Sequence, residues 1–169
     1  MPSWRVHRLW AGRLGLSNRV SEGVDRIIDL GGFFKGYKIG HDWIRGSIGS
    51  FELAAELFHE EFGAEGIKAM MLHGSLDYMD SLARMRYDYE EILWRTIAWI
   101  KFAGAENAIR YVSQLPEEER IKWVLSQSYS YYNYFKKNVR EATLKIAEEL
   151  AQLIKKNINE ILASLRADA

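Results

Sequence analysis

Residues 130–166, SYYNYFKKNVREATLKIAEELAQLIKKNINEILASLR, contain no glycine and no proline. Their apolar residues lie mostly three or four positions apart, which places them on one face of an α-helix. The stripe repeats best every 11 residues, at Val139, Leu150 and Ile161, and this spacing favours a straight or slightly right-handed helix over a left-handed coiled coil. A straight helix of this length would reach roughly 50 Å. We therefore expect a long C-terminal helix, over about 130–166, part of which projects from the domain or packs on a partner.

Helical periodicity continues through the rest of the chain. Only two prolines, Pro2 and Pro116, are present, and no Asn-Gly or Asp-Gly hairpin signal occurs. The sequence predicts an all-α fold: a single helical domain over residues 1–169, built as a bundle of about seven or eight helices. The expected helices before the C-terminal one cover about 4–13, 18–30, a segment from 41, 51–62, 65–83, 88–103 and 106–114, with a further helix from 116.

Particular residues mark the ends of several of these helices. Ser17 and Ser50 are expected to be N-caps, because a serine hydroxyl can accept a hydrogen bond from the first turn. Gly31 and Gly63 are expected to end the two helices that these serines begin. Pro116 suits a first helical position, and three glutamates follow it at the positive end of the helix dipole.

The composition excludes several classes of site. The chain has 169 residues, 23 Lys+Arg, 23 Asp+Glu and no cysteine. Without cysteine there is no disulfide, iron–sulfur cluster, thiolate zinc site or cysteine nucleophile. The charge balance gives no electrostatic reason to expect a protein that coats DNA or a membrane. No apolar run approaches a membrane span or a signal peptide, so we expect a cytoplasmic protein that does not enter a membrane.

One segment has the composition of a loop. Residues 31–40, GGFFKGYKIG, carry four glycines among aromatic side chains. Loops of this kind often carry functional residues when a rigid scaffold holds them.

The histidines and nearby aspartates suggest a metal site. His73 and Asp77 are four residues apart, so on a helix they share a face and could reach one ion. His41 is followed directly by Asp42. Imidazole nitrogens with carboxylate oxygens suit zinc, manganese, iron or magnesium, and need no thiolate. The cofactor that these residues predict is a divalent metal ion.

The order of these residues resembles the HD-domain metal-dependent phosphohydrolases. The resemblance lies in a first histidine, then a His-Asp pair, then further histidines and a final aspartate, and it covers about residues 7–80. It implies that the metal ligands, in this order, are His7, His41, Asp42, His59, His73 and Asp77.

A divalent ion in such a site would activate water for attack on phosphorus. Arg45, one turn after His41, and Lys38 in the glycine-rich segment are then the candidates to neutralise phosphate oxygens. The sequence thus predicts a metal-dependent phosphohydrolase or nuclease acting on an unspecified phosphate ester.

Other interpretations of the same residues remain open. Asp42 could cap a helix, His73 could be a hydrogen-bonded core histidine, and His59 could face solvent. A second class of function is a non-catalytic helical protein that forms a homo-oligomer through its C-terminal helix. A third is a single-strand nucleic-acid binder that uses the aromatic run of residues 129–135, although aromatic side chains spread around a helix more often belong to a core or a protein interface.

Overall fold

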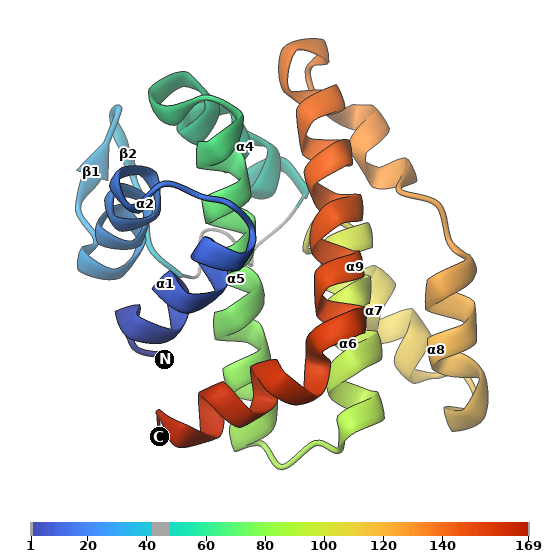
Figure 1. Ribbon diagram of the computed structural model, residues 1–169. Helices are drawn as coiled ribbons and strands as arrows, with labels where there is room; N and C mark the ends of the chain where they lie inside the picture. The colour runs from blue at the N-terminus through green and yellow to red at the C-terminus, as the bar shows by residue number, and fades with distance from the viewer. Residues whose placement is uncertain (1, 42–47, 169) are drawn as a thin grey trace.

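The computed structural model describes residues 2–41 and 48–168, and it is almost entirely helical, as the sequence predicts (Figure 1). The small exception is a two-stranded sheet in the glycine-rich segment. In chain order the described elements are α1 (Trp4–Arg13), α2 (Asn18–Leu30), β1 (Phe33–Phe34), β2 (Tyr37–Lys38), α4 (Ile48–Phe62), α5 (Ala64–Arg84), α6 (Tyr89–Lys101), α7 (Glu106–Ser113), α8 (Glu117–Ser126), the 3₁₀ helix η1 (Ser130–Tyr134) and α9 (Lys137–Ala167).

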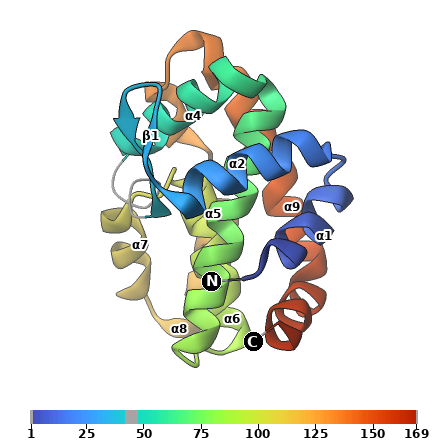
Figure 2. The same ribbon diagram turned by 90° about the vertical axis from the view of Figure 1, so that its left-hand side faces the viewer.

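Helix α5 is the centre of the domain. It packs against α1, α2, α4, α6 and α9, and Figures 1 and 2 show it running through the middle of the molecule. A helix with neighbours on all sides is apolar around most of its circumference, and α5 accordingly buries Ile67, Met70, Leu76 and Met79. Its buried polar residues therefore need partners inside the protein.

The predicted helix boundaries are mostly confirmed. The Ser17 hydroxyl accepts a hydrogen bond from the Val20 amide at 3.4 Å, and α2 ends at Gly31. Two predictions are wrong in detail. Ser50 lies inside α4, which begins at Ile48, so it is not the cap of that helix. Pro116 precedes the first helical residue, Glu117, and occupies the N-cap position instead.

The C-terminal helix differs from the expected straight rod. Helix α9 begins at Lys137 and is kinked at Asn157, whose backbone is non-helical (φ −119°, ψ 16°) and whose side-chain amide donates to the Leu153 carbonyl at 2.8 Å. Its apolar stripe is buried against α5 and α6 of the same chain. After the kink the helix turns across one end of the bundle (Figure 1), and Asp168 accepts hydrogen bonds from Ser3. The stripe thus has its partner within the domain.

The aromatic residues before α9 form the 3₁₀ helix η1 and an extended link where the sequence predicts continuous α-helix. Tyr132 and Phe135 are fully buried, and the Tyr132 hydroxyl donates to the Ile100 carbonyl. Burial of these two rings fixes a backbone that local helix propensity alone does not indicate. Tyr132 is therefore a core residue and offers no face for a nucleic-acid base, whereas Tyr134 is exposed.

The glycine-rich segment forms a short hairpin. Phe33 pairs with Lys38 and Phe34 with Tyr37. The two turn residues, Lys35 (φ 51°) and Gly36 (φ 86°), both have positive φ, as in the tight turns that suit hairpins. Lysine at the first of these positions is uncommon, which explains why the usual Asn-Gly or Asp-Gly signal is absent. Among the described residues, no helix combines the length and apolar character needed to cross a membrane.

Close contact between α4 and α5 depends on Gly66. A Cβ atom added there would lie 2.3 Å from the Phe58 carbonyl oxygen, which belongs to the backbone and cannot move aside easily. We expect Gly66→Ala to lower the free energy of unfolding by about 1–3 kcal/mol, the usual cost of overpacking. Urea denaturation measures this change.

Gly12→Ala is the matched control, because nothing lies within 4 Å of a Cβ atom at that helical position. Alanine there should leave stability unchanged or raise it by up to about 1 kcal/mol. Equal effects of the two substitutions would contradict this account of the α4–α5 contact.

Candidate metal centre

Six histidine and aspartate side chains meet at one place beside α5. Three helices and the segment after β2 supply them. On α2 and again on α5, two of the residues are four positions apart, so each pair projects from one helix face. The six are His7 of α1, Asp25 and Asp29 of α2, His41, and His73 and Asp77 of α5.

Four of these residues place one ligand atom each around a common point. Asp29 Oδ1 lies 3.0 Å from His41 Nε2 and 3.1 Å from His73 Nε2. Asp77 Oδ2 lies 3.3 Å from His73 Nε2 and 2.6 Å from His41 Nδ1. Adjacent ligands of an octahedral ion bonded at about 2.1 Å are about 3.0 Å apart, and those of a tetrahedral ion about 3.4 Å apart. His41 can contribute only one of its two nitrogens to an ion, and one ligand atom from each of the four residues lies within 4.8 Å of the other three.

The other two residues lie on the far side of His73 and Asp77. His7 Nε2 is 3.6 Å from Asp77 Oδ1, the second oxygen of that carboxylate. Asp25 Oδ1 is 2.8 Å from His73 Nδ1. The His7 and His73 rings are stacked, with centroids 4.2 Å apart and an angle of 7° between their planes. This stacking fixes the orientation of both imidazoles.

Hydrogen bonds through Nδ1 turn the Nε2 atoms of two of these imidazoles toward the carboxylates. His7 Nδ1 lies 3.1 Å from the Ser3 carbonyl oxygen, which only accepts, so Nδ1 carries a hydrogen and Nε2 is directed at Asp77. His73 Nδ1 likewise faces the Asp25 carboxylate, and its Nε2 faces Asp29 and Asp77. Metal-binding histidines commonly bond through their other nitrogen to a carbonyl or carboxylate in this way.

Most of the converging atoms are buried without a hydrogen-bond partner. Buried polar atoms in native proteins are nearly always satisfied, so such a group needs an explanation. Seven atoms of the six residues share this property in the part of the chain that the structure describes: His7 Nε2, Asp25 Oδ2, Asp29 Oδ1, His41 Nε2, His73 Nε2, Asp77 Oδ1 and Asp77 Oδ2. A cation bound between Asp29, His41, His73 and Asp77 would satisfy the atoms of these four residues that face it.

The pKa values of Asp77 and His73 reflect the close contact between carboxylates and imidazoles in this cluster. Burial opposes ionisation of Asp77, but His7 and His73 outweigh it and hold the pKa of this carboxyl well below its usual range. Burial also disfavours the charged form of His73, yet Asp25, Asp29 and Asp77 raise the pKa of its imidazole well above the ordinary value. The cluster therefore favours positive charge at His73 Nε2, where a proton and a metal ion compete for one lone pair.

One arginine lies next to the cluster. Arg8 Nη2 is 3.6 Å from Asp25 Oδ2, and the guanidinium lies 5.8 Å from the centre of the Trp4 ring. Its positive charge offsets part of the negative charge of the three carboxylates. It contacts the side of Asp25 that His73 does not use.

The structure brings together four of the six predicted ligands: His7, His41, His73 and Asp77. Asp42 and Arg45 lie outside the described residues. His59 lies in the last turn of α4, and the possible metal-binding groups of the described residues do not include it. Lys38 lies on β2 with an exposed side chain.

Asp25 and Asp29 are members of the cluster that were not predicted from the sequence. Their signal is present in VDRIID (24–29), where the two aspartates are four residues apart, as His73 and Asp77 are. Asp25 is also buried beside Val24 and Ile28 on the inner side of an amphipathic helix. An aspartate among core positions is unusual unless it is paired, and this property could have identified it.

Comparison of the chain with protein-family models, curated proteins and solved structures finds no match. The assignment of this centre therefore depends on its own geometry and chemistry.

If the cluster binds a divalent ion, Mn²⁺ or Zn²⁺ should raise the melting temperature of the metal-free protein. Linkage gives about 2.7 kcal/mol when the free ion is at 100 times its Kd, or roughly 5–10 °C for a domain of this size. His73→Asn should abolish the shift, and His59→Asn should retain it. An equal shift in both variants would contradict the site, and circular dichroism melting curves measure it.

Asp25 and Asp29 should differ in their effect on metal affinity. Asp29 offers an oxygen to the ion, whereas Asp25 orients His73, and loss of an orienting group typically costs about 10–100-fold in affinity. Asp29→Asn should therefore weaken binding more than Asp25→Asn, as measured by competition with a fluorescent chelator. Equal losses would mean that Asp25 is also a ligand.

Proposed function

We propose that this protein is a divalent-metal-dependent phosphohydrolase whose metal ligands are Asp29, His41, His73 and Asp77. The observation that carries the proposal is the convergence of buried nitrogen and oxygen atoms that lack hydrogen-bond partners and lie within 4.8 Å of one another. Nitrogen and carboxylate oxygen ligands without thiolates suit manganese, iron, zinc or cobalt. An ion bound there supplies a Lewis acid that activates water and polarises a phosphoryl oxygen.

Unequal exposure of the ligands supports a catalytic centre over a purely structural one. His73 and Asp77 are almost fully buried, whereas the His41 side chain is 24% exposed. A structural metal site is closed by protein ligands on all sides, while a catalytic site keeps a position open. Substrate is expected to approach on the His41 side.

The remaining residues have separate roles in this proposal. His7 Nε2 lies 3.6 Å from the second oxygen of Asp77, and its Nδ1 is held by the Ser3 carbonyl. Asp25 holds the orientation of His73, and Arg8 limits the build-up of negative charge beside Asp25. The stacked rings of His7 and His73 restrict movement of the ligands during turnover. Each of these contacts lies behind the ligand atoms that face His41.

The choice of phosphate esters as the substrate class is supported by the sequence. The histidines and aspartates follow an order that resembles the HD-domain phosphohydrolases, with His41 and Asp42 as the adjacent pair. The departure from that resemblance lies in α2, because Asp25 and Asp29 join the cluster ahead of the pair. Metal-assisted hydrolysis needs a ligand set that leaves space for water and a phosphoryl group, which fits the exposure of His41.

We expect the purified protein to hydrolyse bis(4-nitrophenyl) phosphate or 4-nitrophenyl phosphate when Mn²⁺ is supplied, and to lose this activity in EDTA. Asp29→Asn should lower kcat/KM by at least about 100-fold, equivalent to about 2.7 kcal/mol of transition-state stabilisation. Release of 4-nitrophenolate is followed by absorbance.

His59→Asn, purified in the same way, is the control and should keep full activity. If Asp29→Asn and the unaltered protein hydrolyse these esters equally, the activity comes from elsewhere and the proposal fails. Tight metal binding without hydrolysis of either ester would also reject it.

A further inference from the structure

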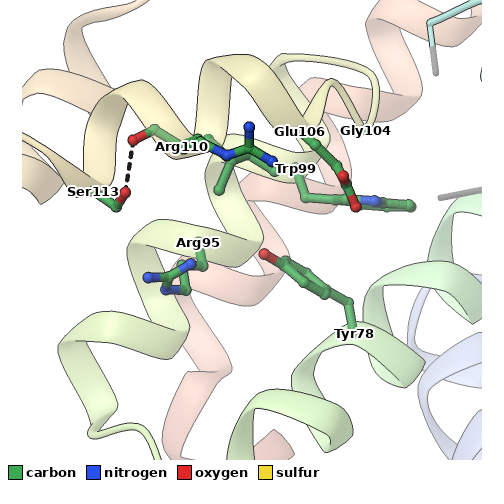
Figure 3. Close-up of a pocket in the computed structure, with 8 residues that line it drawn as sticks. Tyr78, Arg95, Trp99, Gly104, Glu106, Arg110 and Ser113 are labelled. Atoms are coloured by element: carbon green, nitrogen blue, oxygen red, sulfur yellow. Dashed lines mark hydrogen bonds between the residues drawn. The ribbon is translucent and has the colours of Figure 1, made fainter. Parts of the chain in front are cut away.

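A second candidate site lies on the opposite side of α5. A cavity of about 290 Å³ opens between α6, α7 and the side chain of Tyr78 (Figure 3). Adjacent residues of a helix point about 100° apart. Asp77 consequently faces His7 on α1, whereas Tyr78 packs against Trp99 on α6, with ring centroids 6.2 Å apart. The cavity is therefore separate from the metal centre.

Hydrogen-bond donors and positive charge predominate around this cavity. Arg95 and Arg110 both line it, and Figure 3 shows the Tyr78 hydroxyl directed into the space near them. Burial raises the pKa of Tyr78 above its ordinary value despite the opposing effect of Arg95, so its hydroxyl remains a donor at neutral pH. Such a lining suits a ligand rich in acceptors.

Arg95 is held in position before any ligand binds. Its Nε donates to Glu91 at 2.8 Å, and its guanidinium lies 4.8 Å and 4.6 Å from the ring centres of Tyr87 and Trp94. An anchored guanidinium loses little side-chain freedom on binding, which favours affinity. By contrast, the Arg110 side chain is exposed.

Trp99 is buried at the wall of the cavity. Its side chain is 2% exposed and lines the cavity, yet its indole Nε1 is buried without a hydrogen-bond partner among the described residues. A buried indole N–H usually has a partner. The indole N–H is therefore an unused donor on a residue that lines the cavity.

The cavity also has an apolar side. Trp99, Tyr78 and Ile109 line it, and the Trp99 and Tyr78 rings are inclined by 35° with no room for a third ring between them. Benzene fits an apolar cavity of about 150 Å³, so about 290 Å³ accommodates one ring and a small anionic group.

We propose that this cavity binds a small organic anion, a flat ring that carries a phosphate-like or carboxylate group, with the ring on Trp99 and Tyr78 and the anionic group between Arg95 and Arg110. Glu106 also lines the cavity, and in Figure 3 it lies beside Trp99, away from Arg95. Its negative charge disfavours the anionic group at that end and so orients the ligand.

Isothermal titration calorimetry with phenylphosphonate and with benzoate tests the proposal and distinguishes the two anionic groups. Neither probe carries a hydrolysable phosphate ester bond. At least one of them should bind with a stoichiometry of one. Benzyl alcohol, which lacks the charge, and inorganic phosphate, which lacks the ring, should each bind at least tenfold more weakly.

Substitution of exposed charged residues locates the binding. Arg110→Gln should weaken it at least tenfold, and Arg19→Gln, an equal change of charge on α2, should leave it unchanged. Glu106→Gln should strengthen binding, because it removes the negative charge at the cavity. Absence of binding by both anions, or equal effects of the two arginine substitutions, would overturn the proposal.

The proposal does not depend on the metal centre, and the titration is repeated in EDTA to show this. Binding that persists in EDTA and depends on Arg110 supports the cavity. Binding that disappears in EDTA and is unchanged by Arg110→Gln places the anion at the metal centre. That result overturns this inference and does not contradict the phosphohydrolase proposal.

Discussion

Charge compensation among buried acids and imidazoles is the constraint on which this structure depends. Asp25, Asp29 and Asp77 lie together in the interior, where isolated carboxylates are strongly disfavoured. His41 and His73 bring nitrogens within about 3 Å of the Asp29 carboxylate. Helices α1, α2 and α5 carry the acids of the cluster and its imidazoles other than His41. Their packing against one another therefore determines which of the charged groups meet at the site.

Helix α5 separates two environments of different chemistry. Toward α1 and α2 it presents His73 and Asp77, and the surroundings favour a cation. Toward α6 it presents Tyr78, beside the anchored guanidinium of Arg95, and the surroundings favour an anion. Both proposed sites thus use a rigid, buried helix as their common wall, which is the kind of support that precise binding geometry requires.

Local sequence signals predicted the helical elements well because their causes are local. The Ser17 cap and the α2 end at Gly31 involve atoms within a few residues of each other. Part of the candidate site was also predictable, since the four-residue spacing of His73 and Asp77 is itself a helical relation. Asp25 and Asp29 have the same spacing but were not recognised, because nothing local shows that their helix faces α5.

The all-α class, the long C-terminal helix and most helix boundaries follow from the order of the amino acids. Periodicity and capping depend on neighbours three or four residues away. The bend of α9 at Asn157, its packing against α5 and α6, and the hydrogen bond from Tyr132 to the Ile100 carbonyl are seen only in the folded chain. The same is true of the two α2 acids that join the histidines. These features depend on contacts between residues that are far apart in the chain. The spacing of residues along one sequence does not show which distant residues will be in contact.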